Sequence, residues 1–258
     1  MADALYLPSS DPDVFTATTS TQGPWDPTLQ HGGPPSALLT RAAERAESGW
    51  PFTVVRVAVE ILGPIPVGEV RVSHHVARSG KSVELVETEL SAGGRAAAKA
   101  RVWRIRKTEL DVPQIAAVPT DRPALPSERI ESEHWPAGFL EAMDFRYVGT
   151  GGWSVPGPAA MWANLLVPLV DGEQITPLQR LMTLADCGNG VSSALPPGWM
   201  FINPDLTVHL ARYPAGEWMC IDAATTVDPA GFGVAASTLY DLSGRVGHGA
   251  QSLFVSSP

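Results

Sequence analysis

Two stretches of the chain show the apolar spacing of a one-sided helix. The first is PPSALLTRAAERAES, in which Pro35, Leu38, Leu39 and Ala42 recur at i, i+3, i+4 and i+7. The second is PLQRLMTLADCG, whose apolar stripe begins at Leu178. Each stretch opens with proline, which suits a first helical turn because its missing N–H would be unpaired there. We therefore predict one helix in each half of the chain.

Each predicted helix is followed by four runs typical of antiparallel strands. The runs are rich in valine, alternate apolar with polar residues, and are separated by turns containing Gly or Pro. They span residues 53–62, 68–80, 81–92 and 96–105 in the first half, and 201–213, 216–227, 232–244 and 247–257 in the second. Further strands are expected at 13–20, 143–148 and 159–168. This order predicts a duplicated α+β unit, in which each sheet wraps one helix to cover its apolar stripe.

A Pro-rich, charged stretch without periodicity separates the two units. It runs from about residue 107 to residue 140, and we interpret it as a linker. The predicted domains are therefore an N-terminal unit at 1–106 and a C-terminal unit at 141–258.

Composition and net charge exclude several classes of protein. The 258 residues are 44% hydrophobic and 17% charged, which is enough apolar material for a core. The net charge of −9 argues against a general nucleic-acid binder. No apolar run approaches the roughly 18 residues of a membrane span, and the start, MADALYLPSSDPD, lacks the regions of a signal peptide. We expect a cytoplasmic protein that binds no nucleic acid. Cys187 and Cys220 form neither a metal-type pair nor a disulfide framework, so no metal is expected.

One carboxylate falls on the apolar face of the second helix. Asp186 comes eight residues after Leu178 and therefore shares its face. A buried ionised carboxylate is costly unless it is hydrogen-bonded or wetted. When Pro34 is aligned with Pro177, Ala43 takes the corresponding place, so only one unit carries the acid. A single active site would explain this asymmetry. The alternative is an aspartate at the helix end that turns to solvent.

Several pieces of the sequence resemble the double hotdog acyl-CoA thioesterases, and in particular the thioesterase-like branch related to acyl-CoA thioesterase II. The pieces are HGGPPSALLTRAAE, ARSGKSVELVETEL, LMTLADCGNG, FINPDLTVHLARYPAGEWMCIDA and LYDLSGRVGHGAQSLFV. The resemblance implies a double hotdog, that is, two tandem repeats, each an antiparallel sheet wrapped around one long helix. It also implies an acyl-CoA thioesterase of lipid metabolism, with no cofactor besides the CoA of its substrate. Because hotdog sheets commonly associate edge to edge, it further implies a homodimer or higher homo-oligomer.

The same resemblance places a water-activating triad on three residues of the second half. The family uses an Asp on the helix, a Ser/Thr-type residue before a central strand, and a Gln on the last strand. These positions match Asp186, Asn203 and Gln251. Asn203 departs from the pattern, because an amide can hold a water but cannot relay a proton as a hydroxyl can. The alternative reading of Asn203 is a turn residue before Pro204.

The residues before the first helix are expected to bind the substrate. They are His31, Gly32 and Gly33. Backbone N–H groups at a helix start suit a developing oxyanion, and glycine lets a carbonyl approach the backbone closely. We predict the Gly33 N–H as the donor. His31 either lines the site or is a surface or capping histidine. The alternative is a tight turn that binds nothing.

The two ends of an acyl-CoA need an apolar tunnel and cations. Apolar candidates, which also suit plain core positions, are Trp162, Leu165, Leu166 and Met182. Cations available to the CoA phosphates, which also suit a solvated strand face, are Arg78, Lys81, Arg101, Arg104, Arg106 and Lys107.

Two other functions remain open at this point. A hotdog hydratase acting on enoyl thioesters typically uses an Asp/His pair, and Asp186 has no histidine nearby in the sequence. A non-catalytic acyl-ligand binder is favoured by the amide at Asn203.

Overall fold

The first half of the chain forms one helix and six strands. These are β1 (Tyr6–Pro8), β2 (Val14–Ala17), α1 (Gly33–Arg45), β3 (Phe52–Ile61), β4 (Glu69–Arg78), β5 (Val83–Ala92) and β6 (Arg95–Arg106), with a short 3-10 turn η1 (Thr19–Thr21). The structure is a computed structural model, and it describes residues 3–130, 138–149, 155–196 and 198–258. The strand and helix positions agree closely with the alternation and the helical stripe of this half.

The second half repeats this order. Its elements are η2 (Gln114–Ala116), β7 (Met143–Tyr147), β8 (Ala159–Leu165), α2 (Pro177–Ala185), α3 (Gly188–Val191), β9 (Met200–Ile202), β10 (Asp205–Leu210), β11 (Trp218–Asp228), β12 (Phe232–Asp241) and β13 (Gly244–Ser256). Thr176 caps α2, and its hydroxyl accepts a hydrogen bond from the Gln179 N–H at 3.2 Å.

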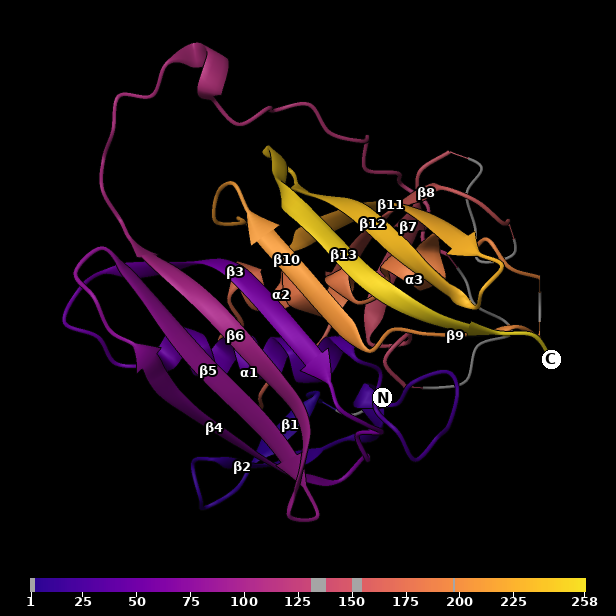
Figure 1. The fold of residues 1–258 in the computed structure, drawn as a ribbon, viewed down its shortest axis with the longest axis horizontal. Coiled ribbons are helices and arrows are strands. Elements are labelled where there is room, and N and C mark those ends of the chain that lie inside the picture. The colour runs from indigo at the N-terminus through magenta and orange to yellow at the C-terminus, as the bar shows by residue number, and fades with distance from the viewer. Residues whose placement is uncertain (1–2, 131–137, 150–154, 197) are drawn as a thin grey trace.

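All of these strands belong to one antiparallel sheet (Figure 1). Its order is β1-β2-β4-β5-β6-β3-β10-β13-β12-β11-β8-β7, and β9 pairs with β13 beside this path. The two halves meet where β3 pairs with β10, with Arg56 opposite His209 and Glu60 opposite Asp205. A continuous sheet therefore fixes the position of one unit relative to the other.

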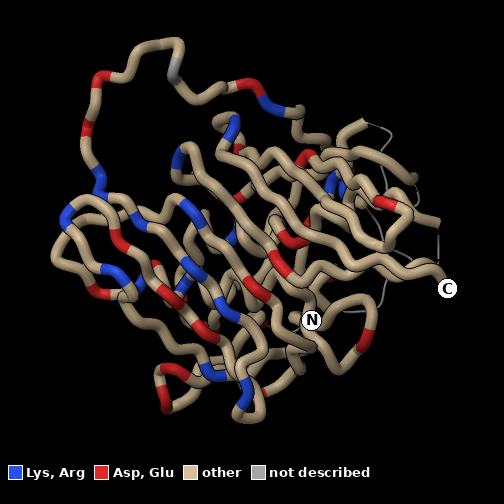
Figure 2. Tube along the Cα trace, in the orientation of Figure 1, with Lys and Arg blue, Asp and Glu red and all other residues tan. Residues whose placement is uncertain are grey.

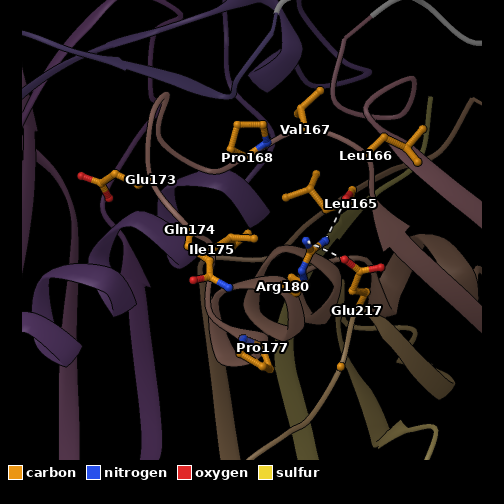
Figure 3. Close-up of a pocket in the computed structure, with 11 residues that line it drawn as sticks. Leu165, Leu166, Val167, Pro168, Glu173, Gln174, Ile175, Pro177, Arg180 and Glu217 are labelled. Atoms are coloured by element: carbon orange, nitrogen blue, oxygen red, sulfur yellow. Dashed lines mark hydrogen bonds and ion pairs between the residues drawn. The ribbon is translucent and has the colours of Figure 1, made fainter.

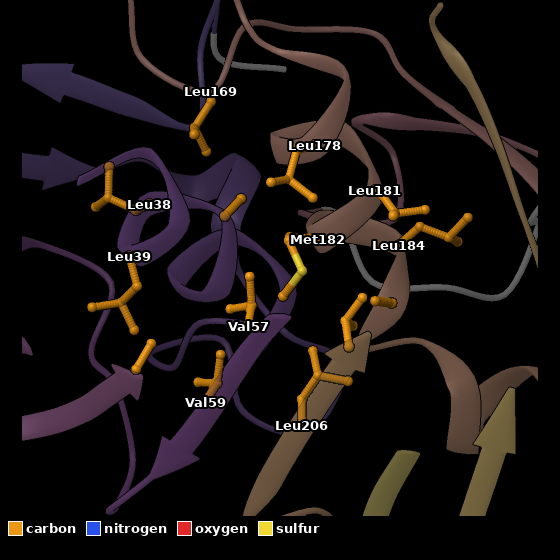
Figure 4. Packing of buried hydrophobic residues seen from close by; sticks show 14 of the residues in the cluster. Leu38, Leu39, Val57, Val59, Leu169, Leu178, Leu181, Met182, Leu184 and Leu206 are labelled. Carbon is orange, nitrogen blue, oxygen red and sulfur yellow. The ribbon is translucent and has the colours of Figure 1, made fainter. Parts of the chain in front are cut away.

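The two main helices pack against each other on the inner side of this sheet. Leu38 of α1 and Leu178, Leu181 and Met182 of α2 are fully buried in one shared core (Figure 4). The core also includes inward-facing residues of β3 and β10, such as Leu206. The apolar stripe of each helix is thus covered both by the sheet and by the other helix.

The second helix is shorter than the pattern predicts. We expected a helix through Asp186 to Gly188, whereas α2 ends at Ala185 and Asp186 is its C-cap. The chain then resumes in the single turn of α3. Asp186 and Cys187, which separate the two helices, have ψ angles of −9° and −1°, away from the α-helical value, and the carboxylate of Asp186 is held by residues of other elements. The expectation of one long helix per unit is therefore met by α1 but not in the second unit.

The run 201–213 is also divided. We expected one strand, but the chain leaves β9 at Ile202 and starts β10 at Asp205. Pro204 explains the interruption, because proline cannot donate a hydrogen bond to a ladder. As a result Asn203 lies between two strands, where its side chain is free to turn toward α2.

The segment after β6 crosses to the second half. Except for η2, its described residues up to 130 have no regular secondary structure. The Arg245 N–H donates to the Pro119 carbonyl at 3.1 Å, and the Ile130 N–H donates to the Phe145 carbonyl at 2.9 Å. Residues 131–137 of the predicted linker lie outside the described residues.

Among the helices within the described ranges, none combines the length and apolar character needed to cross a bilayer.

The buried contact between α1 and α2 leads to a prediction about stability. Leu181→Ala should lower the free energy of unfolding by about 2–5 kcal/mol, because it leaves a cavity in a fully buried position. Leu110→Ala is the matched control, since Leu110 is 77% exposed and its change should stay within about 0.5 kcal/mol. Denaturant unfolding measures both, and equal losses in the two variants would contradict the assignment of the core.

Candidate active site

Asp186 lies at the point where four parts of the chain converge. Its side chain is only 4% exposed. One carboxylate oxygen, Oδ1, faces Asn203 from the β9–β10 junction and Gln251 from β13. The other, Oδ2, faces His31 at the start of α1. A buried carboxylate is tolerated only with such partners.

The two amides hold the carboxylate from the sheet side. Asn203 Nδ2 donates to Asp186 Oδ1 at 2.8 Å, and it also reaches the Asp205 carbonyl at 3.3 Å. Gln251 Nε2 donates to the Asp186 carbonyl oxygen at 3.1 Å and to Oδ1 at 3.3 Å. Gln251 Oε1 in turn accepts from the Asn189 N–H at 3.1 Å, so both ends of this amide are fixed. The structure thus brings the three residues of the expected triad into direct contact.

His31 reaches the same carboxylate from the other half of the chain. Its Nδ1 lies 3.2 Å from Asp186 Oδ2, and its ring stacks on Phe139 with centroids 4.5 Å apart. Burial lowers the pKa of His31, and the charge of Asp186 opposes that effect. The imidazole is therefore a neutral partner, which can donate from Nδ1 to the ionised acid or accept from the protonated acid.

The surroundings of Asp186 act on its pKa in opposite directions. Burial raises the pKa above its ordinary value, while His31, the amides of Asn203 and Gln251, and the backbone of Gly32 favour the ionised form. Burial is the largest of these effects, so the pKa stays raised. A raised pKa makes the carboxylate a stronger base than an exposed aspartate.

The Gly33 N–H, which we expected to donate to the oxyanion, already donates a hydrogen bond within the protein. The Gly33 N–H donates to His31 Nδ1 at 3.0 Å, and Pro34 and Pro35 have no N–H to offer. The Gly33 N–H therefore becomes available to a ligand only when the imidazole turns away or when Nδ1 carries a proton. Sequence reasoning missed this bond, because it does not give the direction of the His31 ring.

Close backbone approach explains the glycine before α1. A Cβ on Gly32 would lie 2.6 Å from Asp186 Oδ2 and 2.9 Å from Oδ1. A Cβ on Gly33 would collide with the Thr183 carbonyl oxygen of α2. Gly188 is constrained in the same way, since its Cβ would lie 2.7 Å from Gln251 Oε1. Glycine at these positions lets α1 and β13 close around the acid.

The apolar candidates do not gather in one tunnel. Met182 lies in the core between the helices (Figure 4), whereas Trp162 packs with Cys220 and Tyr240 in a separate cluster. Leu165 and Leu166 line a pocket of about 500 Å³ beside the first turn of α2 (Figure 3). Asp186 is at the opposite end of that helix, about 14 Å away at 1.5 Å per residue. The pocket is therefore separate from the carboxylate.

Of the predicted cations, Arg104 is unsuited to CoA. It is buried, pairs with Glu84, and donates to the Ala43 and Ala46 carbonyls at the end of α1. This contradicts its assignment to a solvated strand face. Arg101 is exposed but pairs with Glu87 at 3.0 Å.

Cys187, next to the acid, is not an activated nucleophile. It is buried, and burial together with the neighbouring Asp186 raises the pKa of its thiol well above the ordinary value. The thiol is therefore protonated at neutral pH and less reactive than an ordinary cysteine.

Comparison with known proteins identifies the class to which this fold and site belong. A family model for the N-terminal domain of acyl-CoA thioesterases matches residues 21–105, and one for the C-terminal domain of acyl-CoA thioesterases matches residues 117–255. The chain belongs to this acyl-CoA thioesterase family, and it is a thioester hydrolase. A search of curated proteins gives no match.

Solved structures agree on the fold. An acyl-CoA thioesterase II from Mycobacterium marinum is 14% identical with a TM-score of 0.69, covering 97% of this chain and 95% of that chain. A hotdog-fold protein of unknown function from Alicyclobacillus acidocaldarius is 15% identical with a TM-score of 0.74, covering 97% and 96%. These likenesses confirm the double hotdog fold.

The contact at Gly32 gives a prediction for the site. Gly32→Ala should lower thioester hydrolysis by about 100-fold, because a Cβ at this position displaces the Asp186 carboxylate. Gly63→Ala is the control, since a Cβ there meets nothing within 4 Å. Steady-state rates with an acyl-CoA measure the effect. Full activity in Gly32→Ala would show that the rate does not depend on the observed position of the carboxylate.

Proposed function

We propose that the protein hydrolyses an acyl-CoA by means of a water that Asp186 activates and that Asn203 and Gln251 help to hold. The observation that carries this proposal is the convergence of both amides on one carboxylate oxygen, at 2.8 and 3.3 Å. Such an arrangement orients a base without adding a second charge. Because burial lowers the pKa of the neighbouring His31, the carboxylate of Asp186 is the group that takes the proton of the water.

The reaction balances with the residues present. Asp186 takes a proton from water while the water oxygen forms a bond to the thioester carbonyl carbon. The carbon–sulfur bond then breaks, and the proton held by Asp186 goes to the leaving thiolate, which departs as the free thiol of CoA. The other product is the carboxylic acid, and Asp186 is ionised again. His31, Gly32 and Gly33 form the opposite side of the site, where the Gly33 N–H stabilises the oxyanion after the imidazole gives up its hydrogen bond.

Asn203 fits this scheme as a positioning residue. The base is Asp186 itself, so the third residue need not relay a proton. An amide donor keeps Oδ1 fixed and favours the ionised acid. A hydroxyl at this position would do the same with one donor.

The first test is the removal of the base. Asp186→Asn should retain the fold and lower hydrolysis by about 100-fold or more, since an amide cannot accept the proton of water. Asp171→Asn is the matched control, because Asp171 is an exposed acid of the same half. Free-thiol release from a panel of acyl-CoAs, from short to long and including aromatic ones, measures both variants. Unchanged turnover in Asp186→Asn would rule out its role as the base.

The pH profile tests the role of Asn203. Activity requires the ionised acid, so kcat/KM falls as the pH drops through the raised pKa of Asp186. Asn203→Ala removes a donor that lowers this pKa, so the acid limb should move to higher pH. The plateau should also fall by about 10- to 100-fold, the range for a hydrogen bond to a charged group. Asn203→Thr, which keeps a donor, should preserve both the limb and the rate. An acid limb that does not move in Asn203→Ala would contradict the assignment.

The contact between His31 and Asp186 favours one second candidate. An Asp/His pair is the arrangement expected of a hotdog hydratase, and the structure supplies in space the histidine that Asp186 lacks in sequence. Incubation with an enoyl-CoA separates the two reactions. Hydration removes the enoyl absorbance without releasing thiol, whereas hydrolysis releases free thiol.

A further inference from the structure

The pocket beside the first turn of α2 lies outside the site around Asp186. Its volume of about 500 Å³ falls within the range of about 300–1,000 Å³ that is typical of small-molecule sites. Leu166 at its rim is 44% exposed, so the pocket is reached from solvent. Most of its wall is apolar and consists of Leu165, Leu166, Val167, Pro168, Ile175 and Pro177 (Figure 3). A ligand that fills this pocket therefore needs an apolar body.

Arg180 brings one positive charge into the same pocket. Its side chain is only 15% exposed, and it points toward Leu165 and Glu217 (Figure 3). Nη1 donates to Asn164 Oδ1 at 3.1 Å and to the Leu165 carbonyl oxygen at 2.8 Å. Both of these acceptors are neutral, so they hold the guanidinium in place without compensating its charge.

The carboxylate that faces this guanidinium is a weak partner. Glu217 Oε1 lies 3.7 Å from Arg180 Nη2, which is too far for a hydrogen bond, and the Glu217 side chain is 68% exposed. Burial lowers the pKa of Arg180, and the charge of Glu217 opposes this effect without cancelling it. Glu217 comes just before β11 and can turn into solvent without moving a strand. The guanidinium is thus partly buried and has no close anionic partner.

Other arginines of the second half show the contact that Arg180 lacks. The C-terminal unit contains four arginines and no lysine (Figure 2). Arg146 donates two hydrogen bonds to Asp144 at 2.9 and 3.2 Å, and Arg212 donates two to Asp241 at 2.5 and 2.6 Å. Within the described ranges, Arg180 donates to no carboxylate. Because the fork of an arginine matches a carboxylate, this geometry suits a carboxylate supplied by a ligand.

The acids at the rim of the pocket select against a multiply charged ligand. Glu173 lines the pocket, where it pairs with Arg41 at 2.6 Å and with Arg45 at 2.8 Å. Glu217 stands beside the single cation of Arg180. A phosphate group with two charges would be repelled by these carboxylates, whereas a monoanion that displaces Glu217 is balanced by one arginine.

We propose that this pocket binds a monocarboxylate with an apolar chain, whose carboxylate takes the place of Glu217 on Arg180. The chain lies against the apolar wall, and its removal from water contributes to binding. Free carboxylic acids are the class of product that thioester hydrolysis releases. On the basis of the proposed function, the pocket is therefore a second site for the product, apart from the site of Asp186.

Isothermal titration calorimetry with sodium octanoate tests the role of the charge. Arg180→Gln should weaken octanoate binding by about 10-fold or more, the effect of losing a hydrogen bond between charged groups. Glu217→Gln should strengthen it by about 2- to 5-fold, because it removes an exposed acid that competes with the ligand. Glu109→Gln, which removes an exposed acid of the linker, is the control and should change nothing. Equal affinities in all four proteins would overturn the proposal.

A second position keeps the test valid if Arg180→Gln does not fold. Leu166→Asp adds a negative charge to the exposed part of the wall and leaves Arg180 in place. Octanoate binding should fall by about 10-fold or more. Leu166→Asn has the same size without the charge and should cost much less. An equal loss in the two variants would contradict selection by charge.

Two further ligands with the same chain test the headgroup. Octylamine is cationic at neutral pH and 1-octanol is uncharged, so each should bind about 10-fold or more weakly than octanoate. Inorganic phosphate, which has no chain, should not compete with octanoate. Octylamine or octanol that binds as tightly as octanoate, or phosphate that displaces it, would rule out the proposed ligand class.

Asp186→Asn separates this pocket from the catalytic site. Octanoate in the pocket should bind this variant as it binds the wild type, because about 14 Å along α2 lies between the two places. An affinity that changes in Asp186→Asn and not in Arg180→Gln would place octanoate in the site of Asp186 and overturn the proposal. Turnover is not the readout. A protein that binds octanoate as expected but hydrolyses no acyl-CoA would contradict the proposed function alone.

Discussion

The need to satisfy one buried carboxylate organises this molecule. Asp186 is almost inaccessible to solvent, and an ionised acid in that position requires donors on every side. Its partners come from the start of α1, where His31 and the Gly32 backbone lie, and from two amide donors, Asn203 at the junction of β9 and β10 and Gln251 on β13. Each of these elements has a local feature that allows the approach: glycine before α1, Pro204 between the strands, and Gly188 opposite Gln251. Burial outweighs these partners, so the pKa of the carboxylate stays raised, which suits the base that we propose.

The two copies of the repeat contribute different residues to the surroundings of Asp186. The second copy contributes the acid and both amides, while the first contributes the histidine and the glycines at the start of its helix. The pairing of β3 with β10 and the packing of α1 on α2 hold the copies in place. A duplicated chain can keep one site in this way, because the position equivalent to Asp186 in the first copy is Ala43, a fully buried core residue.

The outer faces of the two copies also differ. On the first copy, ion pairs across strands join Lys99 to Glu89 and Arg101 to Glu87. On the second copy, exposed phenylalanines such as Phe232 and Phe254 lie on the same sheet as the exposed acids Asp222 and Asp228.

The sequence by itself determined the repeated order of helix and strands, because apolar periodicity and proline or glycine at the turns are local signals. It also indicated Asp186, through a carboxylate on an apolar stripe, and a family resemblance indicated Asn203 and Gln251. Only the tertiary structure decided that α2 ends before Asp186 and that the strand is divided at Pro204. It also decided that His31 contacts Asp186 and accepts a hydrogen bond from the Gly33 N–H. These features depend on contacts between residues as far apart as 31 and 186, and local patterns carry no information about side-chain direction across such distances.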